Sequence, residues 1–240
     1  MYKETINKLQ NNINSNLSIE ELKILYGIDI EDYCNSDYLE ISKYRNNRNK
    51  YEDLSKIFGD DKIATNLNDI SRYTICYIGN LDYYNELFTD NIKYIFGNLS
   101  SNFDLYIYNL NSLVSVDGNA SFNSVKSAHG LSSLKNISGD ATFGRIQHTL
   151  GLNNLQNIGG SAYFNKLLFA SDLVNLKKIG RDAYFNILES AEGLENLKYV
   201  GGNAYFPKLR SNKYLNENIN PILNSYYPEK TKILFYRNNN

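Results

Sequence analysis

The chain has 240 residues, with 25 lysines and arginines against 26 aspartates and glutamates, so its formal net charge is −1. That balance excludes a general electrostatic attraction to nucleic acid or to acidic membranes. The two cysteines, Cys34 and Cys76, lie too far apart in the sequence to indicate a disulfide framework or a cysteine metal site. Since the chain contains neither an apolar leader nor an apolar run of about 18 residues, we expect a cytoplasmic protein without a membrane anchor.

Residues 1–66 have the spacing and the end signals of helices rather than of a repeat. Ser18–Glu21 matches a capping box, and Gly27 and Gly59 are suitable helix stops. We expect a helical cap that covers the first coil of the repeat region. The alternative is a separate nucleic-acid-binding module, since residues 18–44 could form a helix-turn-helix pair beside a basic cluster at residues 43–50.

Residues 67–110 resemble the later repeats imperfectly, as terminal repeats usually do. The segment Lys93–Asn98 precedes a similar segment, Lys198–Asn203, by five full periods, and Tyr77–Asn80 is an earlier copy offset by 18 residues. Apolar residues alternate from Phe103 to Ile107. This alternation predicts that the strand of this coil is shifted toward those residues.

A regular repeat occupies residues 111–206. Its marker is a phenylalanine that recurs every 21 residues without an insertion, at Phe122, Phe143, Phe164, Phe185 and Phe206. A fixed period of this length predicts a solenoid, in which each repeat forms one coil and neighbouring coils stack.

An alanine lies two residues before each phenylalanine, as in Ala162 and Phe164. This is strand spacing, so both side chains should point into the core, and strands of neighbouring coils should stack about 4.8 Å apart. Equivalent residues then form columns along the solenoid. The phenylalanine column should be a continuous stack inside the protein.

Three-residue spacing precedes each strand, for example at Leu131, Leu134 and Ile137. It predicts a tight helical turn or arch that packs on the strand. Glycines lie between the arch and the strand, where we expect a sharp turn with positive φ. Three asparagines before the second leucine should form buried hydrogen bonds to loop backbone; they are Asn154, Asn175 and Asn196.

These repeats resemble leucine-rich repeats. The segment GLENLKYVGGNAYF, residues 193–206, is similar to the repeats of receptor L domains, and the resemblance covers residues 90–210. The strand departs from the usual leucine-x-leucine pattern because it carries alanine and phenylalanine, and the cysteine-rich caps of secreted receptors are missing. The resemblance implies a parallel solenoid that binds partners through its strand face, and it implies no catalytic residue.

The predicted fold class is therefore an α+β repeat solenoid of 21-residue leucine-rich-repeat-like coils with a parallel β-sheet. The helical cap occupies residues 1–66, the solenoid residues 67–214, and a C-terminal cap residues 215–240. Pro221 and Pro228 should interrupt the chain in the C-terminal cap, and Lys232–Tyr236 is a candidate cover for the last sheet edge.

The candidate binding surface follows from the residues that flank alanine and phenylalanine and should point outward. Tyrosine supplies contact area at a low entropic cost together with a hydroxyl group, and neighbouring acids and amides supply hydrogen bonds. Alternatively, the tyrosines only stabilise the sheet by stacking on one another. The predicted partner-binding residues are Tyr163, Tyr184, Tyr205, Asp140, Asp182, Asn165, Asn186 and Asn203.

Other functions find less support in the sequence. His129 and His148 lie at different repeat positions, with no acid recurring beside them, so we expect neither a catalytic triad nor a metal site. A carbohydrate-active β-helix enzyme remains an alternative, although Asp140 and Asp182 are two coils apart. Nucleic-acid binding would need basic outward strand positions.

We therefore predict a non-catalytic scaffold for protein–protein interaction, without a cofactor, whose partner is a protein. A small solenoid of this kind could act as an inhibitor or immunity-type protein.

Overall fold

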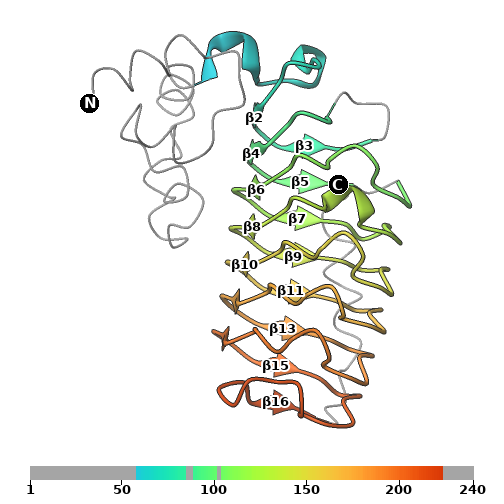
Figure 1. The fold of residues 1–240 in the computed structure, drawn as a ribbon. Helices are drawn as coiled ribbons and strands as arrows, with labels where there is room; N and C mark the ends of the chain where they lie inside the picture. The colour runs from blue at the N-terminus through green and yellow to red at the C-terminus, as the bar shows by residue number, and fades with distance from the viewer. Residues whose placement is uncertain (1–57, 85–88, 102–103, 224–240) are drawn as a thin grey trace, which may run out of the picture.

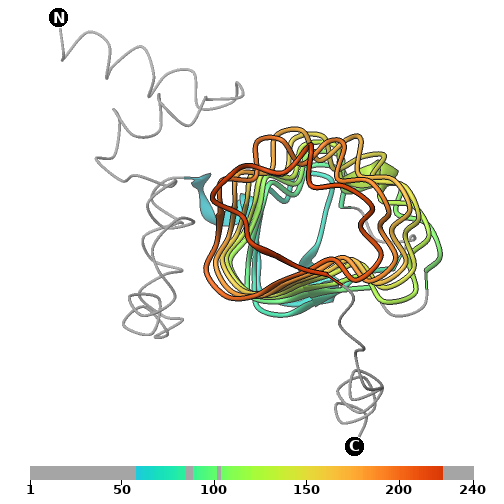
Figure 2. The ribbon, with the colours of Figure 1, turned by 90° about the horizontal axis from the view of Figure 1, so that it is seen from below.

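A computed structural model describes residues 58–84, 89–101 and 104–223 of the chain. These residues form a β-solenoid of about seven turns with parallel strands, which confirms the predicted repeat solenoid (Figure 1). Viewed along its axis, the coils nearly superpose (Figure 2). The predicted helices of the N-terminal cap fall on residues 1–57 and lie outside the described residues.

Each regular coil contributes one short strand to each of two parallel sheets. Sheet A runs down one side of the solenoid in Figure 1. Its strands, in order, are β1 (Ile63–Ala64), β2 (Cys76–Ile78), β4 (Tyr94–Phe96), β6 (Ser115–Val116), β8 (Asn136–Ile137), β10 (Asn157–Ile158), β12 (Lys178–Ile179) and β14 (Tyr199–Val200).

Sheet B faces the viewer in Figure 1 and carries the predicted alanine strands. Its strands, in order, are β3 (Leu81–Asp82), β5 (Leu99–Ser100), β7 (Ala120–Ser121), β9 (Ala141–Thr142), β11 (Ala162–Tyr163), β13 (Ala183–Tyr184), β15 (Ala204–Tyr205) and β16 (Pro221–Ile222). The prediction of a single sheet was wrong. Ile137 and its equivalents, predicted to lie on an arch, form sheet A.

Three short 3-10 helices complete the elements of the described residues: η2 (Asp60–Lys62), η3 (Leu67–Asp69) and η4 (His129–Leu131). Helix η2 leads directly into β1, which pairs with β2. Sheet A thus begins at Ile63, inside the range 1–66 that the sequence assigned to the helical cap.

The phenylalanine column is the centre of the core, as predicted. All five rings are fully buried, and neighbouring rings are stacked with centroids 4.7–5.3 Å apart. The alanines of sheet B are also buried, with at most 3% exposure. Because equivalent residues pair in register, for example Ala162 with Ala183, each coil places its aromatic ring directly on the ring of the coil before it.

The three-residue spacing forms tight turns, as predicted. The amide of Leu134 donates to the carbonyl of Leu131 (2.9 Å), and the same bond recurs between Leu155 and Leu152 (3.0 Å). The side chains of Asn154, Asn175 and Asn196, each just before the second leucine of its turn, donate to backbone carbonyls of the preceding coil, also as predicted. They are not all buried, however, because Asn175 and Asn196 are exposed.

The corner between the two sheets needs glycine for a different reason from the predicted positive φ. None of the six corner glycines named by the repeat has a positive φ; they are Gly139, Gly159, Gly160, Gly180, Gly201 and Gly202. The coils instead approach so closely that a Cβ on Gly180 would lie 2.0 Å from the carbonyl oxygen of Gly159. At the second corner position the nearest atom belongs to a side chain: a Cβ on Gly160 would lie 2.2 Å from Asp140 Oδ1, and 2.7 Å from the backbone atoms Asp140 N and Gly139 C.

Arg181 is the exception among these corner residues, and the preceding coil explains it. The residue that faces the second corner position is asparagine or aspartate at positions 98, 119, 140 and 182, and each is followed by a glycine in the next coil. At position 161 it is a serine, and the next coil carries Arg181. A serine is one atom shorter than aspartate, so its side chain leaves room for a Cβ.

The early coils keep the register of the later ones. Tyr77 pairs with Ile95, so the 18-residue offset seen in the sequence is a real coil step. The shifted strand predicted between residues 103 and 107 was wrong: the strand of this coil is β5, and Leu99 pairs with Ala120. Leu105 is exposed, and Phe103 lies outside the described residues.

Pro221 continues the solenoid instead of interrupting it. It begins β16, which pairs with β15 and is the last described strand of sheet B. In earlier coils the amide at this position, for example that of Ala183, donates to the next coil. Proline has no such donor, so it fits the edge of a sheet, where that amide would have no strand to bind.

Candidate interaction surfaces

The predicted tyrosine column exists on the outer face of sheet B. Tyr163, Tyr184 and Tyr205 lie on β11, β13 and β15, and their rings are stacked with centroids 4.8 Å apart and interplanar angles of 5° and 6°. The middle ring is covered by its two neighbours, so Tyr184 is only 9% exposed, whereas Tyr163 and Tyr205 are half-buried. Stacking and partial exposure therefore occur in the same column.

Local hydrogen bonds and charges act on the tyrosine hydroxyls. The hydroxyl of Tyr184 donates to Asp182 Oδ2 (3.1 Å). Burial raises the pKa of Tyr163 above its ordinary value, and the carboxylates of Asp140 and Asp182 raise it further, whereas a hydrogen bond with Ser161 and the charge of Arg181 oppose the increase. Tyr163 therefore presents a neutral phenol at neutral pH.

The predicted column next to the tyrosines contains Asp140, Asp182 and Asn203. In both aspartates, one carboxylate oxygen already accepts a hydrogen bond from the backbone of the next coil. Asp140 Oδ1 accepts from the amide of Ser161 (2.7 Å), and Asp182 Oδ1 accepts from the amide of Asn203 (2.7 Å). Equivalent bonds join the asparagines of earlier coils. This ladder of side-chain oxygens ties each coil to the next. It uses Oδ1 of Asp140, whereas both carboxylate oxygens of Asp182 accept a hydrogen bond, Oδ1 from the ladder and Oδ2 from Tyr184.

Asn165 and Asn186, the remaining predicted residues, bond to each other. Asn186 Nδ2 donates to Asn165 Oδ1 (3.0 Å), and both residues are half-buried. The structure thus brings all eight predicted residues onto neighbouring positions of coils that stack in register. It also gives most of them a bond within the solenoid.

A second surface was not predicted from the sequence. It lies on the segments that follow sheet B in each coil, and we call it the lateral ledge. Six of the twelve exposed large apolar side chains in the described residues lie there, with exposed fractions from 39% to 60%. They are Leu105, Tyr106, Tyr108, Leu150, Leu168 and Phe169.

Backbone pairing holds the ledge segments against each other. Tyr106 forms a parallel bridge with Ser127, and His148 forms one with Phe169. The ring of His148 stacks on that of Phe169 with centroids 5.1 Å apart, and Tyr106 stacks on Tyr108 at 6.0 Å. The ledge side chains are therefore ordered by their neighbours although solvent reaches them.

The ledge escaped sequence reasoning because its residue types do not repeat. The column that contains Phe169 carries Tyr106, Ser127, His148 and Ser190 at the equivalent positions. A search for recurring outward residues passes over such a column. The signal that could have identified the ledge is the presence of large apolar residues at repeat positions that are polar in other coils.

Other kinds of site find no support within the residues that the structure describes. No group of three or more histidine, cysteine, aspartate or glutamate side chains is arranged to hold a metal ion there. The same residues include no helix that is long and apolar enough to cross a membrane. Cys76 lies buried in β2.

Comparison with known proteins adds no assignment. No protein-family model matches the chain, and no curated protein or solved structure matches it significantly.

Proposed function

We propose that this protein is a non-catalytic scaffold that binds a partner protein through the outer face of sheet B. The observation that carries the proposal is the tyrosine stack, in which Tyr163 and Tyr205 remain half-exposed beside Asp140 and Asp182. A stacked ring loses little conformational freedom on binding, so it offers contact area and a hydroxyl at a low entropic cost.

The ladder bonds support the same proposal because they fix the surface before a partner arrives. Asp182, for example, bonds to the amide of Asn203 through one oxygen and to the hydroxyl of Tyr184 through the other. Preorganised groups of this kind improve affinity mainly by lowering the cost of ordering. The likeness of the repeat to leucine-rich repeats favours the same role, and an inhibitor or immunity-type function would be one use of it.

The test compares capture of proteins by the full chain and by a double variant, Tyr163→Ser with Tyr205→Ser. Tyr184 is left intact because it is 9% exposed and holds the column together. A lysate of the source organism is passed over each immobilised protein, and the retained proteins are quantified by mass spectrometry. We expect at least a tenfold loss of the specific partner with the double variant, in the range expected for hot-spot residues.

Two controls make the result specific. Tyr184→Phe keeps the ring and removes the hydroxyl that bonds to Asp182, so capture should fall less than with the double variant. Tyr199→Ser removes a tyrosine that is 51% exposed on sheet A, away from the proposed surface. Equal capture by the double variant and the unaltered protein, with native far-UV circular dichroism for both, would exclude the outer face of sheet B.

A further inference from the structure

The lateral ledge combines exposed apolar side chains with exposed basic ones. Lys126, Arg145 and Lys166 are exposed and belong to the same segments as the ledge residues. The backbone amide of Lys126 donates to the carbonyl of Leu105 (2.7 Å), so this lysine lies beside the ledge in the neighbouring coil. None of the three forms an ion pair with another described residue.

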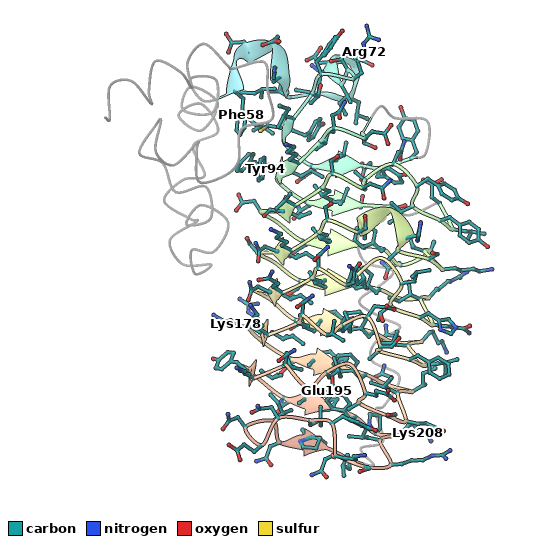
Figure 3. The ribbon with its side chains drawn as sticks, viewed as in Figure 1. Phe58, Arg72, Tyr94, Lys178, Glu195 and Lys208 are labelled. Atoms are coloured by element: carbon teal, nitrogen blue, oxygen red, sulfur yellow. The ribbon has the colours of Figure 1, made fainter. Side chains whose placement is uncertain are left out.

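Within the described residues, the acidic side chains near this part of the ledge form no ion pair with Lys126, Arg145 or Lys166. Asp104 is half-buried. Glu189 and Glu192 belong to the coil after Phe169, and Glu189 is already paired with Arg210 (2.7 Å). Asp172 is half-buried and accepts a hydrogen bond from Thr149 Oγ1 (3.3 Å), beside Leu150. His129 and His148 are also close, and both are exposed. Figure 3 shows Lys208, from the equivalent segment of a later coil, on the side of the solenoid opposite Lys178 of sheet A.

We propose that the lateral ledge binds an acidic protein segment that carries apolar side chains. Phe169, Leu150 and Tyr108, each at least 55% exposed, supply the apolar anchors. Lys126, Arg145 and Lys166 supply the complementary charge. Interfaces concentrate aromatic residues and arginine in this way, and charge complementarity selects the partner and speeds its approach.

The size of the ledge sets the length of the segment. Tyr106 and Phe169 are separated by three coil steps, which corresponds to about 14 Å at the spacing of stacked strands. An extended chain covers that distance with four or five residues at about 3.3 Å each. The ledge therefore fits a short extended segment along the solenoid axis, and we expect an affinity on the order of micromolar for it in isolation.

This inference does not depend on binding at sheet B, since different residues carry it. It is tested on the full chain with a displayed library of random 12-residue peptides. Selection on the unaltered protein is followed by counter-selection against the variant Leu150→Ser with Phe169→Ser. Both side chains are more than half exposed, so the variant keeps the core intact. Enriched peptides are synthesised, and their Kd is measured by fluorescence anisotropy.

We expect the enriched peptides to contain aspartate or glutamate together with leucine or aromatic residues. Their Kd should rise at least tenfold with the Leu150→Ser and Phe169→Ser variant, as for a hot spot. It should also rise several-fold with Arg145→Glu and Lys166→Glu, and with increasing salt. The matched controls are Tyr199→Ser for the apolar change and Lys177→Glu with Lys178→Glu for the charge change. Tyr199 and Lys178 lie on sheet A and Lys177 directly precedes it, so these changes should leave the Kd unchanged.

Three outcomes would overturn the inference. Enriched peptides that need the ledge but carry no excess of acidic residues would contradict the acidic partner. A selection that yields no peptide sensitive to the ledge variant would exclude the ledge as a peptide site, and the proposal for sheet B would keep its own test. Ledge-dependent binding of a 20-nucleotide oligothymidylate in place of any peptide would assign the ledge to nucleic acid.

Discussion

Tyr184 on sheet B and Phe169 on the lateral ledge lie in neighbouring coils and carry rings of similar size, but their surroundings differ. Tyr184 is 9% exposed because a tyrosine covers each of its faces, whereas Phe169 is 57% exposed. Phe169 has a histidine at the equivalent position of one neighbouring coil and a serine at that of the other. In this solenoid, then, the rings in a column of identical residues shield one another from solvent, whereas a ring in a column of different residues stays partly exposed.

The largest expected change in the free energy of unfolding is that of Phe164→Ala, in the core that lies below both surfaces. Phe164 is fully buried and stacked on both sides at 5.1 Å. Its loss leaves a cavity in the core and should lower the free energy of unfolding by about 3–5 kcal/mol in equilibrium urea denaturation. Leu168→Ala in the same coil, at a side chain that is 39% exposed, is the control. A cost for Phe164→Ala as small as that of the control would mean that the phenylalanine column is not the core.

A direct comparison of the two surfaces comes next. Tyr184→Ala should cost about 2–3 kcal/mol of unfolding free energy, from lost burial and two lost ring contacts. Phe169→Ala should cost about 0.5 kcal/mol, as for most surface substitutions. If urea denaturation gave the two variants equal costs, the distinction between a self-covering column and an exposed one would fail.

A substitution at the corner between the two sheets should change the free energy of unfolding somewhat less. Gly160→Ala places a Cβ 2.2 Å from Asp140 Oδ1 and should cost about 1–3 kcal/mol through overpacking. Asp140→Ser should relieve the part of that cost that comes from the carboxylate, because a serine already precedes Arg181 in the next corner. The backbone contacts of 2.7 Å with Asp140 N and Gly139 C remain. In a double-mutant cycle measured by urea denaturation, the combined variant should be more stable than the sum of the single changes predicts. Additive costs would show that the carboxylate does not set the need for glycine.

The smallest effect concerns pH. Since the pKa of Tyr163 is raised above its ordinary value of 10.0, its contribution to stability is fully present below pH 10. That contribution is lost as the pH rises through the raised pKa, because the unfolded chain ionises first. Between pH 9 and pH 11, unfolding free energies should therefore fall less steeply for Tyr163→Phe than for the unaltered protein. Identical slopes for Tyr163→Phe and the unaltered protein would contradict the raised pKa.

Sequence periodicity predicts the part of the fold in which every coil obeys the same rule. The recurrence of Phe164 and its equivalents determines the coil length, the stacking of the core and the position of the tyrosine column. The second sheet escapes prediction because its strands in the regular coils are two residues long, and in β8, β10 and β12 only the isoleucine is buried. Alternation cannot be recognised in so short a strand.

The candidate surfaces are predictable to a different degree. The outward position of Tyr184 follows from its place next to Phe185, but its burial depends on how closely the neighbouring rings stack. The ledge consists of residues such as Phe169 and Leu150, whose residue types do not recur at the equivalent positions of other coils. The repeat predicts the architecture that all coils share, whereas the exposure of residues that depart from the repeat depends on their neighbours in three dimensions.

The pair formed by Ser161 and Arg181 has a consequence for how such a chain can be rearranged. Although the coils have the same length, each one is compatible only with a neighbour whose side chain suits its corner. If residues 165–185 were transplanted behind a coil that carries aspartate at the position of Ser161, the Cβ of Arg181 would meet a carboxylate oxygen. Duplication, deletion or exchange of whole units, as used to engineer longer solenoids, would therefore have to move residue 161 together with residue 181.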